Sequence, residues 1–288
     1  MTWFIFALLN AIFSSLKDIS SKKSLREFDE YISGWSLRFF AFLILCPLLL
    51  FTQIPPLGPV FWQALLLGTI LNAAATILFM KALKTSEISR VIPLISFEPV
   101  FLIITAPFIL GEIPTIYGLF GIVLIVMGAY FLNMSSKTEN LFEPFTTLVR
   151  HKGSRIMVAV TLIWSITSLI DKIGITNSSP IFWVIAFNGV LTLFLTPIML
   201  YKSRKKIKAI PRNIKMLLPV GGFNAVSQIC QAIAFSLTQV SYVMAVKRMS
   251  SLITVGYGGV GLREKHFKRR IFATILMILG AAIIIIFS

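Results

Sequence analysis

The chain has 288 residues, of which 57% are hydrophobic and only 13% are charged, and its mean hydropathy is +0.87. A soluble domain would be about half apolar and about a quarter charged. Apolar runs of about 20 residues, the length that spans a bilayer, recur along the whole sequence. The composition therefore excludes a soluble globular domain and predicts an all-α integral membrane protein.

The formal net charge of +16 would suit a nucleic-acid-binding protein, but the basic residues gather in loops between the apolar runs. This is the positive-inside pattern of membrane proteins, so we expect a lipid bilayer and no nucleic acid as partner. Cys46 and Cys230 lie within apolar runs and predict no disulfide. His151 and His266 lie in loops without metal-ligand spacing. We therefore expect neither a metal nor a cofactor.

Ten apolar segments predict ten transmembrane helices. In chain order they cover residues 2–20, 33–52, 61–83, 88–110, 115–133, 155–175, 180–201, 214–237, 240–261 and 270–287. Most of the 27 basic residues fall on one side of the membrane by this alternation, and the other side has at most Lys172. The pattern predicts a multi-pass protein of the cell membrane (plasma or inner) with basic loops in the cytoplasm and both termini outside.

The second half of the chain repeats the first at an offset of 152 residues. At this offset Asn72-Ala73 aligns with Asn224-Ala225, Glu112 with Glu264, and Gly128-Ala129 with Gly280-Ala281. We expect a first five-helix repeat at 1–134, a cytoplasmic linker at 135–154 and a second repeat at 155–288. Five spans per half make the repeats inverted, which is typical of secondary transporters. The oligomeric state stays open, because a monomer would already contain both repeats.

The segment "SFEPVFLIITAPFILGEIPTIYGLFGIVLIVMGAYFLN" contains an EP pair in the fourth span, a GE pair after it and a glycine-spaced fifth span. With the five-plus-five repeat, it resembles the EamA-type permeases of the drug/metabolite transporter superfamily. The second half keeps "RE" at Arg263-Glu264 and also Gly280. The resemblance covers essentially the whole chain and implies a transporter, while its motifs do not specify the substrate.

A narrower resemblance concerns "VKR" in the ninth span, which is similar to the organic-phosphate antiporters of the same superfamily. In that family the basic pair grips phosphate, together with a lysine three residues before EP. Lys247 and Arg248 match the pair, and Ile95 occupies the position of the third cation.

Lys247 and Arg248 also stand out without any resemblance, because an ionisable residue inside a span is costly and by default indicates function. The alternatives are that they snorkel to the lipid headgroups or that they face a cavity. Adjacent helical residues project about 100° apart, which disfavours lipid contact by both. Ser251, Thr254 and Gly258 continue a polar stripe from Lys247.

Glu98 is the expected counter-charge, because its repeat mate is Ser250, within one turn of Lys247. It is either a permanent structural ion-pair partner or a carboxylate that pairs with the cations in the empty site or carries a proton. Pro99 removes the hydrogen bond to the Ile95 carbonyl, and a freed carbonyl at membrane depth favours a site or a hinge.

Polar residues at helical spacing on the first, sixth and eighth spans line a solute path or only join helices. The candidate substrate-binding residues are Lys247, Arg248, Glu98, Ser251, Asn224, Gln228, Gln231, Asn10, Ser14 and Trp164. The sixth-span stripe also contains Ser168 and Asp171.

The sequence predicts a secondary transporter that moves a small anionic or zwitterionic metabolite by alternating access. Lys247, Arg248 and Glu98 together carry a charge of +1, which favours an anion. One alternative is an exporter of hydrophobic or cationic drugs or amino acids, which would use an unpaired carboxylate and aromatic walls. Another is a membrane-embedded enzyme or sensor. No catalytic nucleophile–base pair is evident, and "GYGGVG" at 256–261 lacks the strand that a nucleotide site requires.

Overall fold

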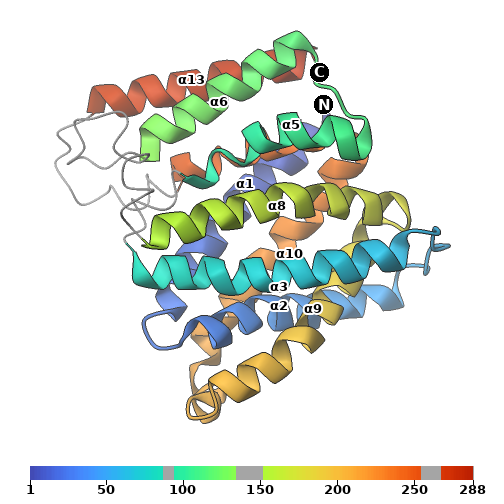
Figure 1. The fold of residues 1–288 in the computed structure, drawn as a ribbon, viewed down its shortest axis with the longest axis vertical. Helices are drawn as coiled ribbons and strands as arrows, with labels where there is room; N and C mark the ends of the chain where they lie inside the picture. The colour runs from blue at the N-terminus through green and yellow to red at the C-terminus, as the bar shows by residue number, and fades with distance from the viewer. Residues whose placement is uncertain (87–93, 134–151, 254–266, 288) are drawn as a thin grey trace.

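The computed structural model describes residues 1–86, 94–133, 152–253 and 267–287, and every regular element in these ranges is a helix (Figure 1). The α-helices are α1 (Thr2–Ser24), α2 (Glu30–Leu45), α3 (Phe61–Thr85), α5 (Glu98–Leu110), α6 (Ile116–Asn133), α8 (Lys152–Thr176), α9 (Pro180–Lys202), α10 (Ile214–Leu237), α11 (Val240–Lys247) and α13 (Phe267–Phe287). Short 3-10 helices are η1 (Cys46–Leu50), η2 (Ile207–Ala209) and η3 (Pro211–Asn213).

Six helical segments are long and apolar enough to cross a bilayer, namely 2–24, 30–50, 61–85, 152–176, 180–202 and 207–237. Three shorter apolar helices cover 98–110, 116–132 and 271–287. Each of the ten predicted segments contains a helix. The chain is therefore a helical multi-pass membrane protein, while the count of ten crossings and the inverted orientation of the halves stay predictions.

The predicted fourth and ninth spans are not continuous helices, because each is interrupted by a tight turn. In the first half, the Phe97 amide donates to the Leu94 carbonyl at 3.3 Å, just before α5 begins. In the second half, the Met249 amide donates to the Val246 carbonyl at 2.9 Å, just after α11 ends. Both atoms of one bond are 152 residues from those of the other, which is the offset of the sequence repeat.

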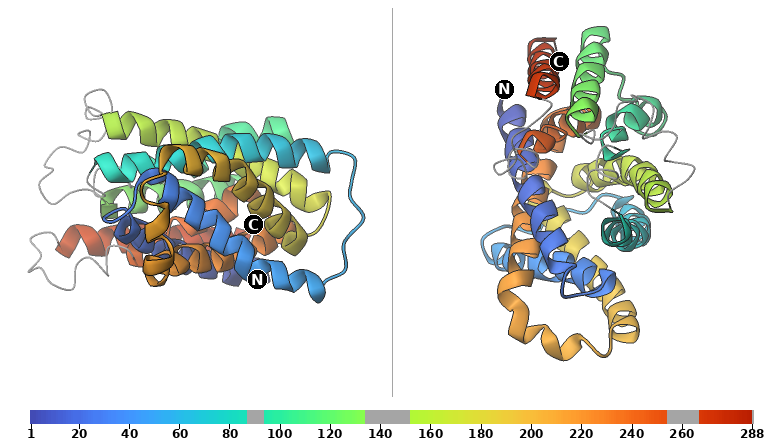
Figure 2. Two further views of the ribbon diagram at one scale, coloured as in Figure 1. Left: turned by 90° about the horizontal axis from the view of Figure 1, so that it is seen from below. Right: turned by 90° about the vertical axis from the view of Figure 1, so that its left-hand side faces the viewer.

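The helices pair across the two halves in a repeated pattern. α1 packs along α10, and its counterpart α8 packs along α3. α6 packs against α13 at one edge of the bundle, and α2 against α9 toward the opposite edge (Figures 1 and 2). Lys22 on α1 donates to the Leu83 carbonyl in the last turn of α3, and Lys172 on α8 donates to the Phe235 carbonyl in the last turn of α10.

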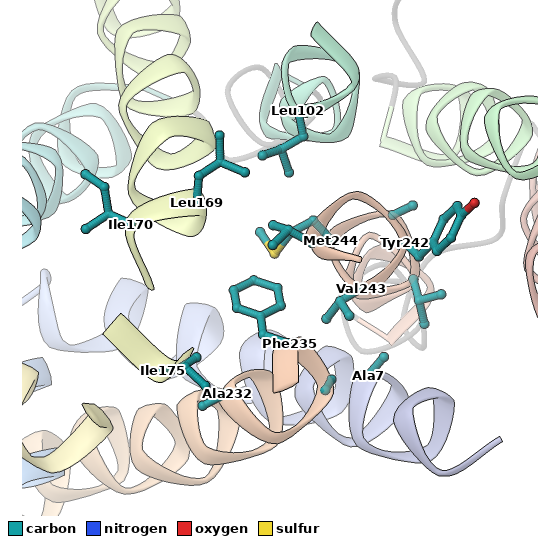
Figure 3. Packing of buried hydrophobic residues seen from close by; sticks show 14 of the residues in the cluster. Ala7, Leu102, Leu169, Ile170, Ile175, Ala232, Phe235, Tyr242, Val243 and Met244 are labelled. Carbon is teal, nitrogen blue, oxygen red and sulfur yellow. The ribbon is translucent and has the colours of Figure 1, made fainter. Parts of the chain in front are cut away.

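Close packing holds these pairs together. Lipid tails are as apolar as the side chains, so helices associate through van der Waals packing and interhelical hydrogen bonds. At the centre, Leu102 of α5, Leu169 of α8, Phe235 of α10 and Met244 of α11 converge, each at most 1% exposed (Figure 3). At the α6–α13 crossing, a Cβ on Gly121 would lie 2.7 Å from the Gly280 carbonyl oxygen, so the helices approach closely only because glycine is there.

The two chain ends lie at the same end of the bundle (Figures 1 and 2). An even number of crossings returns the chain to the side on which it began. The arrangement fits the predicted ten spans and says nothing about which side is the cytoplasm.

Candidate functional site

A cavity of about 120 Å³ lies where the two interrupted helices meet, and its walls come from both halves of the chain. Its lining is unusually charged for a site at membrane depth. The charged lining residues are Lys17, Asp18, Arg38, Glu98, Asp171, Lys247 and Arg248. Four cations face three carboxylates, which leaves a formal charge of +1.

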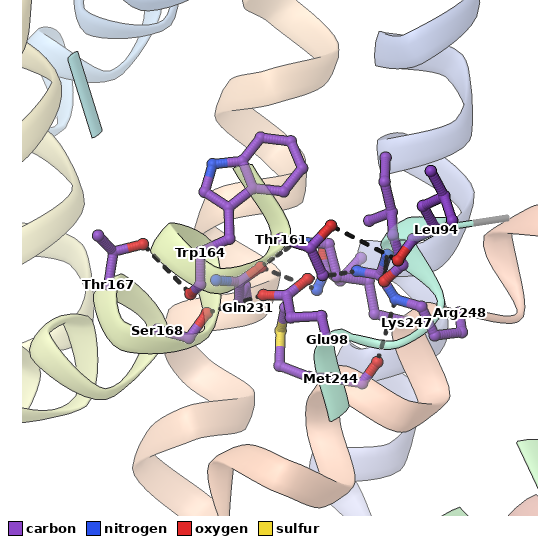
Figure 4. Close-up of polar contacts among 12 residues, drawn as sticks. Leu94, Glu98, Thr161, Trp164, Thr167, Ser168, Gln231, Met244, Lys247 and Arg248 are labelled. Carbon is purple, nitrogen blue, oxygen red and sulfur yellow. Dashed lines mark hydrogen bonds and ion pairs between the residues drawn. The ribbon is translucent and has the colours of Figure 1, made fainter. Parts of the chain in front are cut away.

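Arg248 is fully engaged in the wall of this cavity and is 8% exposed. Its Nη2 donates to Glu98 Oε2 at 3.1 Å, its Nη1 to the Ile95 carbonyl at 3.3 Å, and its Nε to the Met244 carbonyl at 3.4 Å (Figure 4). The Ile95 carbonyl is available because Pro99, four residues later, has no N–H to donate. The break that the proline imposes on the first half thus supplies a partner to a cation of the second half.

Glu98 is 1% exposed, and both of its carboxylate oxygens have partners. Oε2 receives Arg248, and Oε1 accepts from the Ser168 hydroxyl at 3.3 Å (Figure 4). Glu98 is also the first residue of α5, where the partial positive charge of a helix N-terminus favours a carboxylate.

Lys247 has a different environment from its neighbour, because its hydrogen-bond partner is neutral. Its Nζ donates to Gln231 Oε1 at 2.7 Å, and within the described ranges no carboxylate lies at ion-pair distance from it. Asn10 supports this contact from behind the cavity wall: its Nδ2 donates to the same Gln231 oxygen at 3.4 Å, and its Oδ1 accepts from Ser227 at 2.7 Å. The charge of Lys247 is therefore held in the cavity without direct neutralisation.

All the candidate residues predicted from the sequence line the cavity except Asn10, which is fully buried behind it. The structure thus places both basic side chains in the cavity wall and not at the lipid headgroups. The Ser251 hydroxyl donates to the Arg248 carbonyl at 2.5 Å, and Asn224 donates to Gln228 at 3.1 Å. The described residues do not include Thr254, Gly258, "GYGGVG", Arg263-Glu264, His151 and His266.

Four charged residues that line the cavity were not among the candidates predicted from the sequence, namely Lys17, Asp18, Arg38 and Asp171. Arg38 on α2 is 6% exposed and lines the cavity, and its signal was a lone cation within the predicted second span. Asp171 on α8 was visible only as part of a polar stripe, and its carboxylate now proves to line the same cavity. Asp171 Oδ1 accepts from the Trp183 indole at 3.1 Å.

A second polar cluster ties α8 to the connections that follow α5 and α10. Lys172 Nζ lies 3.3 Å from Glu112 Oε1 and donates to the Thr238 carbonyl at 2.8 Å. Glu112 Oε2 in turn accepts from the Val240 amide at 2.8 Å, which caps the N-terminus of α11. We call Lys172, Glu112 and these two backbone groups the Lys172 cluster.

These observations define a helical multi-pass membrane protein whose two halves enclose a charged cavity. The sequence profile of the EamA-like transporter family matches residues 1–134 and 151–286, which is nearly the whole chain. The chain therefore belongs to the EamA-like transporter family, and it is a membrane transporter of that family. The resemblance to the EamA-type permeases is confirmed, and the narrower one to the organic-phosphate antiporters stays a prediction.

Two further comparisons concern individual proteins. No curated protein matches the chain. One solved structure, described only as the crystal structure of a protein, superimposes with a TM-score of 0.70 over 98% of this chain and 94% of its own, at 14% sequence identity. Such a low identity shows a shared fold and carries no information about substrate.

Proposed function

We propose that this protein is a secondary transporter of the cell membrane that moves a small anionic or zwitterionic metabolite by alternating access through ten spans in two inverted repeats. The observation that carries the proposal is Lys247, a cation in the cavity wall whose hydrogen-bond partner, Gln231, is neutral. A partly buried charge at membrane depth without direct compensation is costly, and an anionic solute would supply that compensation.

The neighbouring Arg248 adds to this anion site without being its main source of charge. Its guanidinium already pairs with Glu98. An incoming acidic group that approaches Lys247 would therefore share Arg248 with Glu98 or displace the carboxylate. Arg offers a planar fork and Lys a point charge, and the two together can hold an oxyanion from two directions.

Alternating access is supported by the two helix breaks, because broken helices at a repeat interface are a common hinge and binding site in transporters. The Lys172 cluster supports it as well. It joins the connection after α5 to the start of α11, so it would close one end of the cavity while the other end opens.

The cationic-exporter alternative has one observation in its favour, namely that Asp171 lines the cavity without a cation at ion-pair distance in the described ranges. The net formal charge of +1 still favours an anion. An enzyme or sensor would instead bind a ligand without moving it.

Thermal stability and transport measurements on the purified protein separate these alternatives. Small anions, inorganic phosphate and sulfate included, should raise the melting temperature, since a ligand of the folded state stabilises it by mass action. Lys247→Gln should weaken this effect by about 1.5–3 kcal/mol, the range for a charged hydrogen bond. The matched control is Lys84→Gln, which removes an exposed cation that does not line the cavity.

Proteoliposomes then decide between transport and mere binding. An anion that stabilises the protein should be taken up in exchange for itself, and Lys247→Gln should reduce that uptake at low substrate concentration. Stabilisation by organic cations that Asp171→Asn abolishes would support the cationic exporter. Binding with no uptake under any gradient would support the enzyme or sensor.

A further inference from the structure

Arg38 lies in the cavity wall with most of its hydrogen-bonding capacity unused. The side chain is 6% exposed, and only Nη2 has a partner, the Thr76 hydroxyl at 3.3 Å. Nε and Nη1 are buried and have no acceptor among the described residues. Buried polar groups are almost always hydrogen-bonded, so two orphaned donors on one guanidinium need a specific reason.

Arg248, in the same cavity, is an example of a guanidinium whose three nitrogens all have hydrogen-bond acceptors. Arg248 uses Nε, Nη1 and Nη2, and each has an acceptor within 3.4 Å. Its charge is also matched by Glu98. A purely structural role would give Arg38 a comparable set of partners, and it has one neutral hydroxyl.

A second orphaned donor lies one helical turn from the partner of Arg38. Thr76 is on α3, and Asn72, four residues earlier, lines the cavity and is 6% exposed. Its Nδ2 is buried without an acceptor in the described part of the chain. The unmatched groups of Arg38 and Asn72 are thus all hydrogen-bond donors, and a ligand that satisfies them must bring acceptor oxygens.

The charge around Arg38 also fits an acidic ligand group. Asp171 is a carboxylate that lines the same cavity as Arg38 and Lys247. Across the described residues, no carboxylate lies at ion-pair distance from Arg38. The Glu98–Arg248 and Lys17–Asp18 pairs neutralise themselves. This leaves two cations, Arg38 and Lys247, against the single carboxylate of Asp171.

We propose that Arg38, with Asn72, forms a second anion-binding subsite in this cavity, so that the transported solute carries an acidic group at each end. One end docks at Lys247 and Arg248, and the other at Arg38. Asp171 offsets part of the positive charge while the site is empty and interacts with any basic group between the two acids. This inference rests on the proposed function, because it assigns a second contact to the same solute.

The experiment compares acids that differ only in their second acidic group. The probes are glutarate with its half amide, and propane-1,3-diyl bisphosphate with its monophosphate. Affinities are measured on purified protein and on the Arg38→Gln, Arg38→Lys, Lys247→Gln and Lys84→Gln variants. The melting temperature of each variant without ligand shows whether it is folded.

For at least one pair, the diacid should bind about 10- to 100-fold more tightly than its monoacid, the range for one charged hydrogen bond. Arg38→Gln should abolish that ratio, whereas Lys247→Gln should lower the affinity for both the diacid and the monoacid. Arg38→Lys should retain part of the ratio, because the charge stays and the fork is lost. Lys84→Gln should change neither affinity.

Two outcomes overturn the second subsite: diacids and monoacids that bind within twofold of each other for both pairs, or a diacid preference that persists in Arg38→Gln. If Arg38→Gln does not fold, the Arg38→Lys ratio decides, and an unchanged ratio there counts against the subsite. Failure of the anion-transport proposal looks different, because then no acid binds or Lys247→Gln has no effect on any of them.

Discussion

Loss of charge at the two adjacent cations of the cavity should destabilise the protein to very different extents. Arg248→Gln leaves Glu98, 1% exposed, without its cation. Breaking a buried pair by removing one partner costs about 3–5 kcal/mol of folding free energy, because the remaining charge is uncompensated. Lys247→Gln removes a bond to neutral Gln231, so we expect a loss of about 1 kcal/mol or less, together with the loss of anion affinity.

Reversible unfolding in mixed micelles measures both effects, and a double-mutant cycle isolates the pair. Glu98→Gln combined with Arg248→Gln should cost clearly less than the sum of the single changes, since neither charge then remains alone. The reasoning is refuted if Lys247→Gln destabilises the protein as much as Arg248→Gln does, or if the cycle is additive.

Three further predictions concern topology, closure and packing. The topology is tested in a variant that lacks Cys46 and Cys230. A single cysteine placed at exposed Pro56 should react with an impermeant thiol reagent in intact cells, and one placed at exposed Lys205 should not. The reverse result would mean that the predicted topology is inverted. Lys172→Gln should increase the rate at which the same reagent, added outside the cell, labels a cysteine placed at Ala232, which is 3% exposed. An unchanged rate would show that the Lys172 cluster does not close the cavity. Gly121→Ala should destabilise the protein by about 1–3 kcal/mol through overpacking at the α6–α13 crossing. The matched Gly222→Ala, whose Cβ would meet only Ile44 at 3.5 Å, should have little effect in the same unfolding assay.

The parts of the site that are local in sequence could be predicted, because each depends on one strong physical cost. Lys247 and Arg248 are conspicuous since a cation within a span is expensive, and the structure places both in the cavity wall. The position of Pro99 predicted that the Ile95 carbonyl lacks its helical hydrogen bond, and Arg248 donates to this carbonyl. The repeat offset placed Glu98 opposite the basic pair, and Glu98 forms an ion pair with Arg248.

The contacts that depend on how distant helices pack could not be predicted. Gln231 was a candidate, but nothing in the sequence makes it the partner of Lys247, because the rotation of α10 against α11 is fixed only by packing. The same holds for Arg38 and Asp171, which come from α2 and α8 and meet one cavity. Asn10 was expected at the site and instead supports Gln231 from behind.

The second helix break shows a further limit, because no proline causes it. The chain turns after Lys247, where the Ser251 hydroxyl bonds the Arg248 carbonyl and so competes with the helical ladder. The break in the first half could be anticipated from Pro99, and the one in the second half only from the repeat.

The repeat preserves the backbone of the site but not its chemistry. At the offset of 152, Ile95 corresponds to Lys247, Ser96 to Arg248 and Glu98 to Ser250. The cations thus belong to one half and the carboxylate to the other, so the Glu98–Arg248 bond joins the two halves at the point where both helices are broken. If the halves move against each other during transport, Glu98 and Arg248 must either stay paired and move together or change partners. A solute anion that takes the place of Glu98 on Arg248 would release the tie between the halves and keep the guanidinium compensated. Under the proposed alternating access, this exchange would couple occupancy of the site to the movement of the halves.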